Sequence, residues 1–255
     1  MTHVLWRTIV LFVIFIGTAG CGKTTLVKSF GEWLEEHGLQ VSYVNLDPGV
    51  EQLPYKATFD VRDIVRTSDL MRSMGLGPNG AMILAAQLME ERISDVVRGI
   101  MRKDSDYVLI DTPGQMELFV FRSLGPSLTS AIKNVGRAVA VYIVDAETVY
   151  DASEYLVIKL LSLIIELRLD IPTVTVVNKG DLVDLSKLVV RADEIKDRLS
   201  LKRDLLSDLA LELVDLVFKY ERASRLVVIS ALKKTGLDRL HDLILEAFCV
   251  CGDLT

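Results

Sequence analysis

The stretch Gly17-Thr18-Ala19-Gly20-Cys21-Gly22-Lys23-Thr24 decides the fold of this chain. It fills every fixed position of the phosphate-binding pattern G-x-x-x-x-G-K-[ST], and an apolar run that ends at Ile16 precedes it. In such a loop the glycines let backbone amides close around phosphate oxygens. Lys23 then reaches the terminal phosphates, and the Thr24 hydroxyl is placed to coordinate magnesium. Residues 26–36 follow as a predicted helix whose positive end faces the anion. The loop therefore predicts a nucleotide-binding protein.

Length and composition indicate one large α/β domain. The chain has 255 residues, half of them hydrophobic, which is enough for one domain or for one domain with an insertion. Val, Ile and Leu recur in short blocks between helical patterns, as is typical of a parallel sheet buried on both faces. The formal net charge of −6 and the absence of a basic stripe argue against a nucleic-acid partner.

The cysteines favour a reducing, cytoplasmic setting. Cys21, Cys249 and Cys251 form neither a disulfide framework nor a metal-spaced quartet. A redox or metal role for the C-terminal C-x-C pair stays open beside the simpler interpretation of a tail folded onto the domain.

The apolar N-terminal segment resembles a signal or an anchor only superficially. Residues 8–16 are too few to span a bilayer, and cleavage at the small residues that follow would destroy the phosphate loop. We therefore predict no membrane association and assign residues 12–16 to the first buried strand. The role of residues 1–8 stays open.

Strand and helix patterns alternate along the rest of the chain. Strands are predicted over residues 12–16, 41–46, 107–110, 138–144, 173–177 and 225–229. Helices are predicted over residues 26–36, 60–74, about 81–103 with Asn79 available as a cap, 154–169 and 236–248. This order predicts a doubly wound, mostly parallel sheet flanked by helices, the α/β fold of P-loop NTPases.

A helical insertion is predicted over about residues 182–224, within a single domain spanning residues 1–255. Its composition shifts to Leu, Asp, Lys and Arg. Apolar residues recur there at helical spacing, at Leu206, Leu209, Leu213 and Leu216. This stripe favours packing on the chain's own domain over a partner-binding surface, although both remain open.

Two motifs at strand ends carry further chemistry. Asp111 follows four apolar residues, the setting of a Walker B carboxylate that stabilises hydrated magnesium, and the Gly114 amide would approach the γ-phosphate. Asn178-Lys179-Gly180-Asp181 predicts guanine over adenine, because a carboxylate accepts two hydrogen bonds from guanine N1–H and its exocyclic amine. Ser230-Ala231-Leu232 would add a backbone contact to the guanine oxygen. A plain turn is the alternative at each motif, but their order favours function.

Taken together, these motifs resemble those of the GPN-loop GTPases, a P-loop family in the class of the MinD-like and signal-recognition GTPases. The matching residues span nearly the whole chain: Gly17 to Thr25, Asn45-Leu46-Asp47-Pro48, Leu53-Pro54-Tyr55, Asp60-Val61-Arg62, Gly77-Pro78-Asn79, Asp111-Thr112-Pro113-Gly114-Gln115, Asn178-Lys179-Gly180-Asp181 and Ser230-Ala231. The closing segment from Cys249 to Leu254 is also similar to the ends of archaeal members.

The resemblance implies a magnesium-dependent enzyme that converts GTP to GDP and phosphate. The implied nucleotide contacts are Gly20, Cys21, Gly22, Lys23, Thr24, Thr25, Gly114, Asn178, Lys179, Asp181, Ser230, Ala231 and Leu232. The implied magnesium site is Thr24, Asp47 and Asp111, and the implied catalytic groups are Lys23, Asp47, Asn79 and Gln115. Asp47 is the stronger candidate for positioning water, because a glutamine directly after D-x-x-G could instead cap the next helix.

The resemblance also implies a homodimer in which each Gly77-Pro78-Asn79 loop reaches the partner's nucleotide, and a protein client, since eukaryotic members are linked to RNA polymerase assembly. Related ATPases carry an extra lysine where this chain has Thr18-Ala19, so we expect slow intrinsic turnover. Two alternatives remain: a GTP-binding chaperone in which hydrolysis is incidental, and a P-loop kinase. Asn178-Lys179-Gly180-Asp181 and the lack of an arginine-rich lid argue against the kinase.

Overall fold

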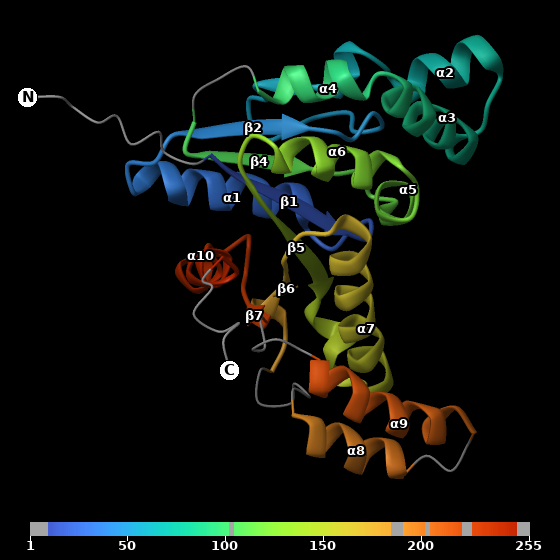
Figure 1. Ribbon diagram of the computed structural model, residues 1–255, viewed down its shortest axis with the longest axis vertical. Helices are drawn as coiled ribbons and strands as arrows, with labels where there is room; N and C mark the ends of the chain where they lie inside the picture. Colours follow the sequence, from blue (N-terminus) through green and yellow to red (C-terminus); the bar gives the residue numbers. More distant parts are fainter. Residues whose placement is uncertain (1–9, 102–104, 185–190, 202–204, 221–225, 249–255) are drawn as a thin grey trace, which may run out of the picture.

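Seven parallel strands form one central sheet in the computed structural model, which describes residues 10–101, 105–184, 191–201, 205–220 and 226–248 (Figure 1). The strand order is β3-β2-β4-β1-β5-β6-β7, and every neighbouring pair is parallel. The strands are β1 (Leu11–Gly17), β2 (Val41–Asn45), β3 (Phe59–Asp60), β4 (Tyr107–Asp111), β5 (Arg137–Asp145), β6 (Thr173–Asn178) and β7 (Leu226–Val228). The predicted doubly wound α/β fold is confirmed.

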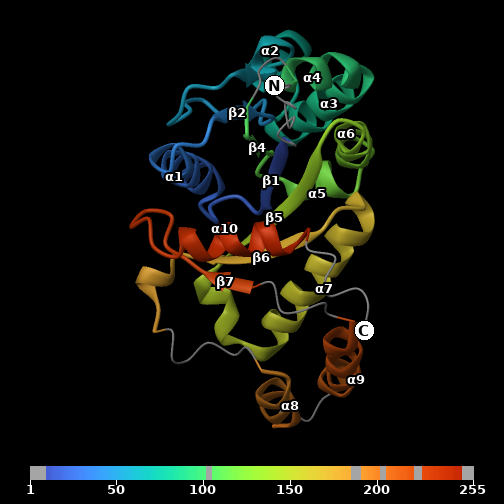
Figure 2. The ribbon, with the colours of Figure 1, turned by 60° about the vertical axis from the view of Figure 1, so that its left-hand side comes forward.

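Helices cover both faces of this sheet (Figures 1 and 2). They are α1 (Lys23–Glu36), α2 (Thr67–Met74), α3 (Pro78–Glu91), α4 (Ile93–Ile100), α5 (Met116–Val120), α6 (Leu124–Lys133), α7 (Ala152–Leu169), α8 (Ala192–Ser200), α9 (Leu205–Tyr220) and α10 (Leu237–Glu246). Helices α1 and α10 pack on one face, and α3 to α9 contribute to the core on the other. The loops that follow β1, β2, β4, β6 and β7 therefore all leave one buried sheet.

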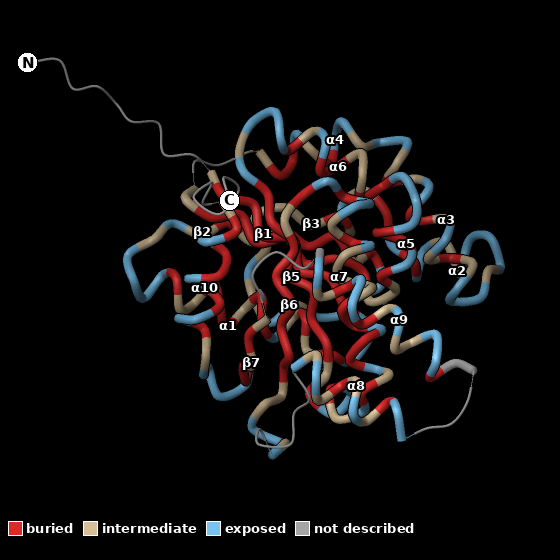
Figure 3. Tube along the Cα trace, turned by 60° about the horizontal axis from the view of Figure 1, so that its bottom comes forward, coloured by how far each residue is buried: buried red, intermediate tan, exposed pale blue. Residues whose placement is uncertain are grey.

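The central strand β1 shows why the sequence folds this way. Its residues alternate between the two cores: Phe12, Ile14 and Ile16 face α3 to α9, and Val13 and Phe15 face α1 and α10. All five residues are almost fully buried, as a strand covered on both faces requires. The strands at the centre of the sheet are coloured as buried in Figure 3. Such a run delivers the next residues, the phosphate-binding loop, to the carboxyl edge of the sheet, where ligands bind in open α/β folds.

Two helix predictions between β2 and β4 were wrong. Residue Asp60 lies in β3 and accepts a hydrogen bond of 2.9 Å from Arg62 N, which starts a 3₁₀ turn, so the helix begins only at Thr67. The long helix predicted over residues 81–103 is two helices with a break at Arg92, which lets both α3 and α4 turn an apolar face to one core. Its last predicted residues, 102 and 103, lie outside the described residues.

The predicted cap at Asn79 was also wrong. Helix α3 begins at Pro78, Gly77 occupies the N-cap position, and Asn79 lies within the first helical turn. Proline at the first position suits a helix start, because its missing N–H would have no intrahelical partner there. The Asn79 side chain is therefore left for other contacts.

Helices α8 and α9 lie in the region of the predicted insertion and pack beside α7, at the opposite end of the molecule from α2 (Figure 1). The buried face of α9 is not the predicted leucine stripe. Val214 and Val217 are buried, whereas Leu209 and Leu216 are each 53% exposed. Leu213 is partly buried, and the side chain of Leu206 lies outside the described residues.

Three sequence expectations concern the ends and the membrane. Residues 1–8 and the pair Cys249 and Cys251 lie outside the described residues. None of the helices in the described ranges combines the length and the apolar character that crossing a membrane requires.

Candidate nucleotide-binding site

The phosphate-binding loop joins β1 to α1 in a conformation that requires glycine. Gly20 and Gly22 have φ angles of 82° and 88°, in the left-handed region, and Gly22 is the N-cap of α1. The loop leads directly into the helix N-terminus, where unpaired amides can bind an anion. Lys23 is buried, and its Nζ donates to the Gly17 carbonyl at 3.2 Å, so its ammonium group is held at the loop.

Asn178 joins the loop to two other segments. Its Nδ2 donates to the Cys21 carbonyl at 2.9 Å, and its Oδ1 accepts from Ala231 N at 3.0 Å. A Cβ atom at Gly22 would lie 2.3 Å from Asn178 Nδ2, so this approach also requires glycine. The side chain of Ser29, on α1, donates to the Ala231 carbonyl at 2.7 Å. One buried network thus ties together the loop, β6 and the segment after β7.

The residues expected to recognise guanine lie at the carboxyl ends of β6 and β7. Lys179 adopts a left-handed φ of 64° and forms an ion pair with Asp145. Asp181 is exposed, and Leu232 is 75% exposed. The structure thus brings the predicted motif to one accessible edge. Of the backbone groups in Ser230-Ala231-Leu232, from which a guanine contact was predicted, the Ala231 N–H donates to Asn178 here.

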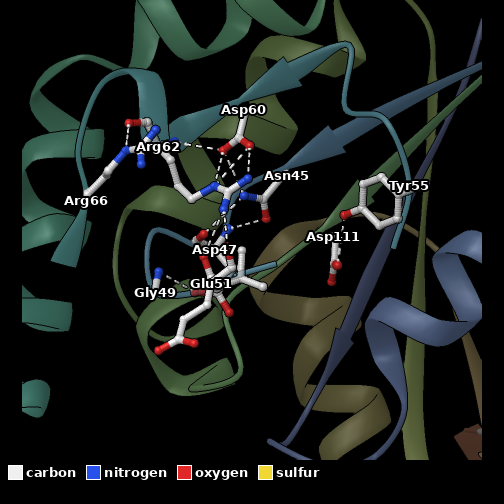
Figure 4. Close-up of polar contacts among 10 residues, drawn as sticks. Asn45, Asp47, Gly49, Glu51, Tyr55, Asp60, Arg62, Arg66 and Asp111 are labelled. Carbon is white, nitrogen blue, oxygen red and sulfur yellow. Dashed lines mark hydrogen bonds and ion pairs between the residues drawn. The ribbon is translucent and has the colours of Figure 1, made fainter. Parts of the chain in front are cut away.

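Asp111 is the buried acid of the site. It ends β4 beside the phosphate-binding loop and is 1% exposed. Its Oδ2 accepts a 2.9 Å hydrogen bond from the Tyr55 hydroxyl, while its Oδ1 has no hydrogen-bond partner among the described residues (Figure 4). Burial raises the pKa of Asp111 to about 6, against the opposing effects of the Thr24 hydroxyl and the Lys23 ammonium group.

Asp47 stands at the end of the neighbouring strand β2. Its backbone is fixed by Asn45, whose Nδ2 donates to the Asp47 carbonyl at 3.1 Å and whose Oδ1 accepts from Asp47 N at 3.0 Å. Its carboxylate accepts from Gly49 N at 2.8 Å and is close enough to raise the pKa of Asp111 further.

The donor set at this edge suits magnesium. Thr24, Asp47 and Asp111 offer one hydroxyl and two carboxylates, the hard oxygen ligands that Mg²⁺ prefers, and the unpartnered Asp111 Oδ1 is a buried acceptor that still needs a donor or a cation. Within the described ranges, no cluster of three or more His, Cys, Asp or Glu side chains suits a metal ion.

Arg62 fixes the segment that follows Asp47, a role that sequence reasoning missed. Its guanidinium binds both carboxylate oxygens of Asp60 and donates to the carbonyls of Val50 and Glu51 at 3.0 Å each (Figure 4). Such a fork of donors holds a loop in one geometry. In the sequence, Asp60-Val61-Arg62 carries only the family resemblance, and nothing in that string indicates the clamp on Val50 and Glu51.

Asn79 and Gln115 meet within one chain. Gln115 Nε2 donates to Asn79 Oδ1 at 3.1 Å across the exposed edge of the site. Gln115 occupies the N-cap position of α5, but its side chain makes no capping bond. Gln115 lines a cavity of 610 Å³, and Asn79 directly follows another lining residue, Pro78. The lining also includes Ala19, Asp47, Arg62 and Gly114. Through Ala19 the cavity borders the phosphate-binding loop.

Comparisons with known proteins cover nearly the whole chain. Residues 15–250 match the family described as "Conserved hypothetical ATP binding protein". The chain is 37% identical over 253 residues to the GPN-loop GTPase PAB0955 of Pyrococcus abyssi, with 96% of this chain and 100% of that protein covered. It is 28% identical to GPN-loop GTPase 1 of Dictyostelium discoideum, with 91% of this chain and 60% of that protein covered. The crystal structure of PAB0955, described as a GTPase in apo form, matches with a TM-score of 0.85 and 35% identity, covering 94% of this chain and 98% of that one.

Proposed function

The chain belongs to the GPN-loop GTPase family, and from this premise we propose that it is a magnesium-dependent GTPase that works as a dimeric, nucleotide-controlled switch. The observation that carries the proposal is that two groups of polar residues from the same chain flank the phosphate-binding loop. Asp111, with its unpartnered oxygen, lies on one side of the loop, and the Asn178 network lies on the other.

Binding would begin with the phosphates. Amides at the start of α1 and the Lys23 ammonium group would neutralise the charge of the phosphate chain, and the Gly114 amide lies near Ala19, on the side where a γ-phosphate would end. Mg²⁺, when bound, would draw charge from the phosphate oxygens, and Thr24, Asp47 and Asp111 would hold it directly or through water.

Hydrolysis would be an in-line attack by water on the γ-phosphate. Asp47 is fixed by Asn45 at the edge of the cavity and would orient the water, with Gln115 as the second candidate. Neither side chain has to break a buried contact to reach water. Since the early loop residues are Thr18 and Ala19 rather than lysine, we expect turnover to be slow.

Guanine selectivity would come from Asp181, helped by the fixed position of Asn178. The exposed Asp181 carboxylate can accept from both guanine donors, which adenine does not offer in that arrangement. The family description names ATP and the relatives are named GTPases, so the choice of base is the first property to measure.

Dimerisation would redirect Asn79. In the single chain Asn79 bonds Gln115, and its exposed position leaves it free to exchange that weak contact for one with the partner's phosphates. The exchange would link hydrolysis to the association of two chains. A protein client, expected from the family resemblance, would then read the nucleotide state through the insertion at about residues 182–224 of this single domain.

The test is hydrolysis of GTP and ATP by the purified protein, with and without Mg²⁺, across protein concentration and beside Asn79→Ala. We expect slow, GTP-selective, Mg²⁺-dependent turnover per chain that rises with dimerisation and falls in the variant. Equal rates for GTP and ATP would contradict the assignment of Asp181. Tight GTP binding without turnover would favour the assembly-factor alternative, and Asp47→Asn acting normally in cells would favour it too.

A further inference from the structure

Tyr55 makes a contact that neither the motifs nor the proposed reaction explain. It lies on the segment between β2 and β3, and its hydroxyl donates to Asp111 Oδ2 at 2.9 Å (Figure 4). Among the described residues, Tyr55 makes the side-chain hydrogen bond to that carboxylate, while the nearby Thr24 hydroxyl lowers the pKa of Asp111 without contacting Oδ1 at hydrogen-bond distance. One carboxylate oxygen is therefore held while the other is left free.

A second tyrosine holds the Tyr55 ring in place. The rings of Tyr43 and Tyr55 stack with centroids 5.2 Å apart and an interplanar angle of 21°. The Tyr43 hydroxyl, in turn, fills the space beside Gly31 of α1, where a Cβ atom would lie only 2.3 Å from it. The stack thus connects the first helix, which begins at the phosphate-binding loop, with the acid at the end of β4.

The phenol stays a hydrogen-bond donor at neutral pH. The ordinary pKa of a tyrosine side chain is about 10, so its hydroxyl carries its proton at neutral pH. A neutral phenol beside a buried carboxylate gives a charge-assisted hydrogen bond, which is directional as well as strong. The contact therefore fixes the orientation of the Asp111 carboxylate and not merely its position.

We propose that Tyr55 is a positioning residue for magnesium, holding the Asp111 carboxylate so that its free oxygen faces the ion or an ion-bound water. This inference rests on the proposed function, since it needs Mg²⁺ at the site. Partners of this outer kind set ligand orientation, and their loss typically lowers metal affinity about 10- to 100-fold.

The segment between β2 and β3 links both expected carboxylate ligands of magnesium. Asp47 and Tyr55 lie on one connecting segment, whose start is clamped by Arg62 through the carbonyls of Val50 and Glu51. That segment therefore supplies one expected magnesium ligand and the support of another. Metal binding and the ordering of the segment would then favour each other by the same free energy.

The experiment is a metal titration of Tyr55→Phe, with Tyr43→Phe as the matched control. Each variant removes one hydroxyl from the same ring stack, but in this structure only Tyr55 bonds to Asp111. One readout is release of a fluorescent GDP analogue over a range of Mg²⁺ concentrations. The other is direct binding of Mn²⁺ to the GDP complex, followed by electron paramagnetic resonance.

We expect Tyr55→Phe to raise the Mg²⁺ concentration for half-maximal GDP retention about 10-fold. GDP affinity without metal, and kcat at saturating Mg²⁺, should stay within about twofold of wild type, and Tyr43→Phe should match wild type in metal affinity. A purely structural role for Tyr55 would instead lower stability and GDP affinity in the absence of metal.

Two other outcomes separate this proposal from the one on which it rests. Unchanged metal affinity in Tyr55→Phe, with affinity lost in Asp111→Asn, would overturn the role of Tyr55 and leave the magnesium site standing. A wild-type protein that hydrolyses GTP equally fast with and without Mg²⁺ would overturn the magnesium-dependent function itself.

Discussion

Two glycines of one loop give a matched test of how the nucleotide site is built. Gly20 and Gly22 both have left-handed φ angles, of 82° and 88°. A Cβ atom at Gly20 would meet nothing within 4 Å, whereas one at Gly22 would lie 2.3 Å from Asn178 Nδ2. Replacing either glycine by alanine therefore adds the same methyl group and nearly the same backbone strain. Only Gly22→Ala also displaces the Asn178 side chain.

The expected costs differ severalfold. A left-handed alanine costs about 1 kcal/mol, which is the whole effect expected for Gly20→Ala. In Gly22→Ala the Asn178 amide must also move, breaking its bonds to Cys21 and Ala231. Each stranded buried group costs about 1–3 kcal/mol, so the total is about 4 kcal/mol. That is a large part of the roughly 5–15 kcal/mol by which a domain is stable.

Urea unfolding without nucleotide measures this difference directly. With a denaturant slope of about 3 kcal/mol per molar, the Gly22→Ala midpoint should lie about 1 M below that of Gly20→Ala. Working without ligand keeps phosphate contacts out of the comparison. Equal midpoints for the two variants would refute the reasoning, because they would mean that the Asn178 network adds nothing to stability.

Three further predictions concern other parts of the molecule. On α9, Val214→Ala should lower the free energy of unfolding by about 2 kcal/mol, whereas Leu209→Ala should change it by less than about 0.5 kcal/mol. Chemical denaturation measures both changes, and a larger loss for Leu209→Ala would mean that the leucine stripe is the packed face. Burial lowers the pKa of His241, which lies 2.9 Å from the Tyr107 hydroxyl. As the pH drops below about 6.5, the unfolded chain takes up a proton that the folded chain resists, so acid destabilises the fold. Thermal melts between pH 5 and 8 should therefore show wild type losing more stability on acidification than His241→Gln. Asp181→Asn should weaken GTP binding about 100-fold, because it replaces one of two hydrogen-bond acceptors with a donor, and should leave ATP binding nearly unchanged. Equal losses of affinity for both nucleotides in a calorimetric titration would contradict a role in base selection.

The central strands could be predicted because their composition, their length and the residues that follow them all indicate the same structure. In the run from Leu11 to Gly17, unbroken apolar residues, strand length and the glycine-rich loop that follows all point to a buried parallel strand. The loops that follow β1, β4 and β6 lie at strand ends, as predicted, for the same reason, whereas Gly77-Pro78-Asn79 lies where α2 leads into α3. Their individual roles remain predictions that the experiments above test.

The elements that could not be predicted depend on tertiary contacts. Strand β3 has only two residues and exists through pairing with β2 and the Asp60–Arg62 contact. Helix α9 is apolar around most of its surface, so its periodicity could not distinguish the valine face from the leucine face. The phenol of Tyr55 approaches Asp111 across a long loop, and nothing local in Leu53-Pro54-Tyr55 indicates that contact.

The sheet ends in two very short strands, and this limits how the protein can associate. β3 at one edge has two residues and β7 at the other has three. Few backbone N–H and C=O groups are therefore exposed in register at either edge, which guards against strand-to-strand aggregation. Two copies of this chain have little chance of merging their sheets into one. Any stable pairing must instead be made by side chains on helices and loops, which can loosen and re-form without disturbing the hydrogen-bonded centre of the fold.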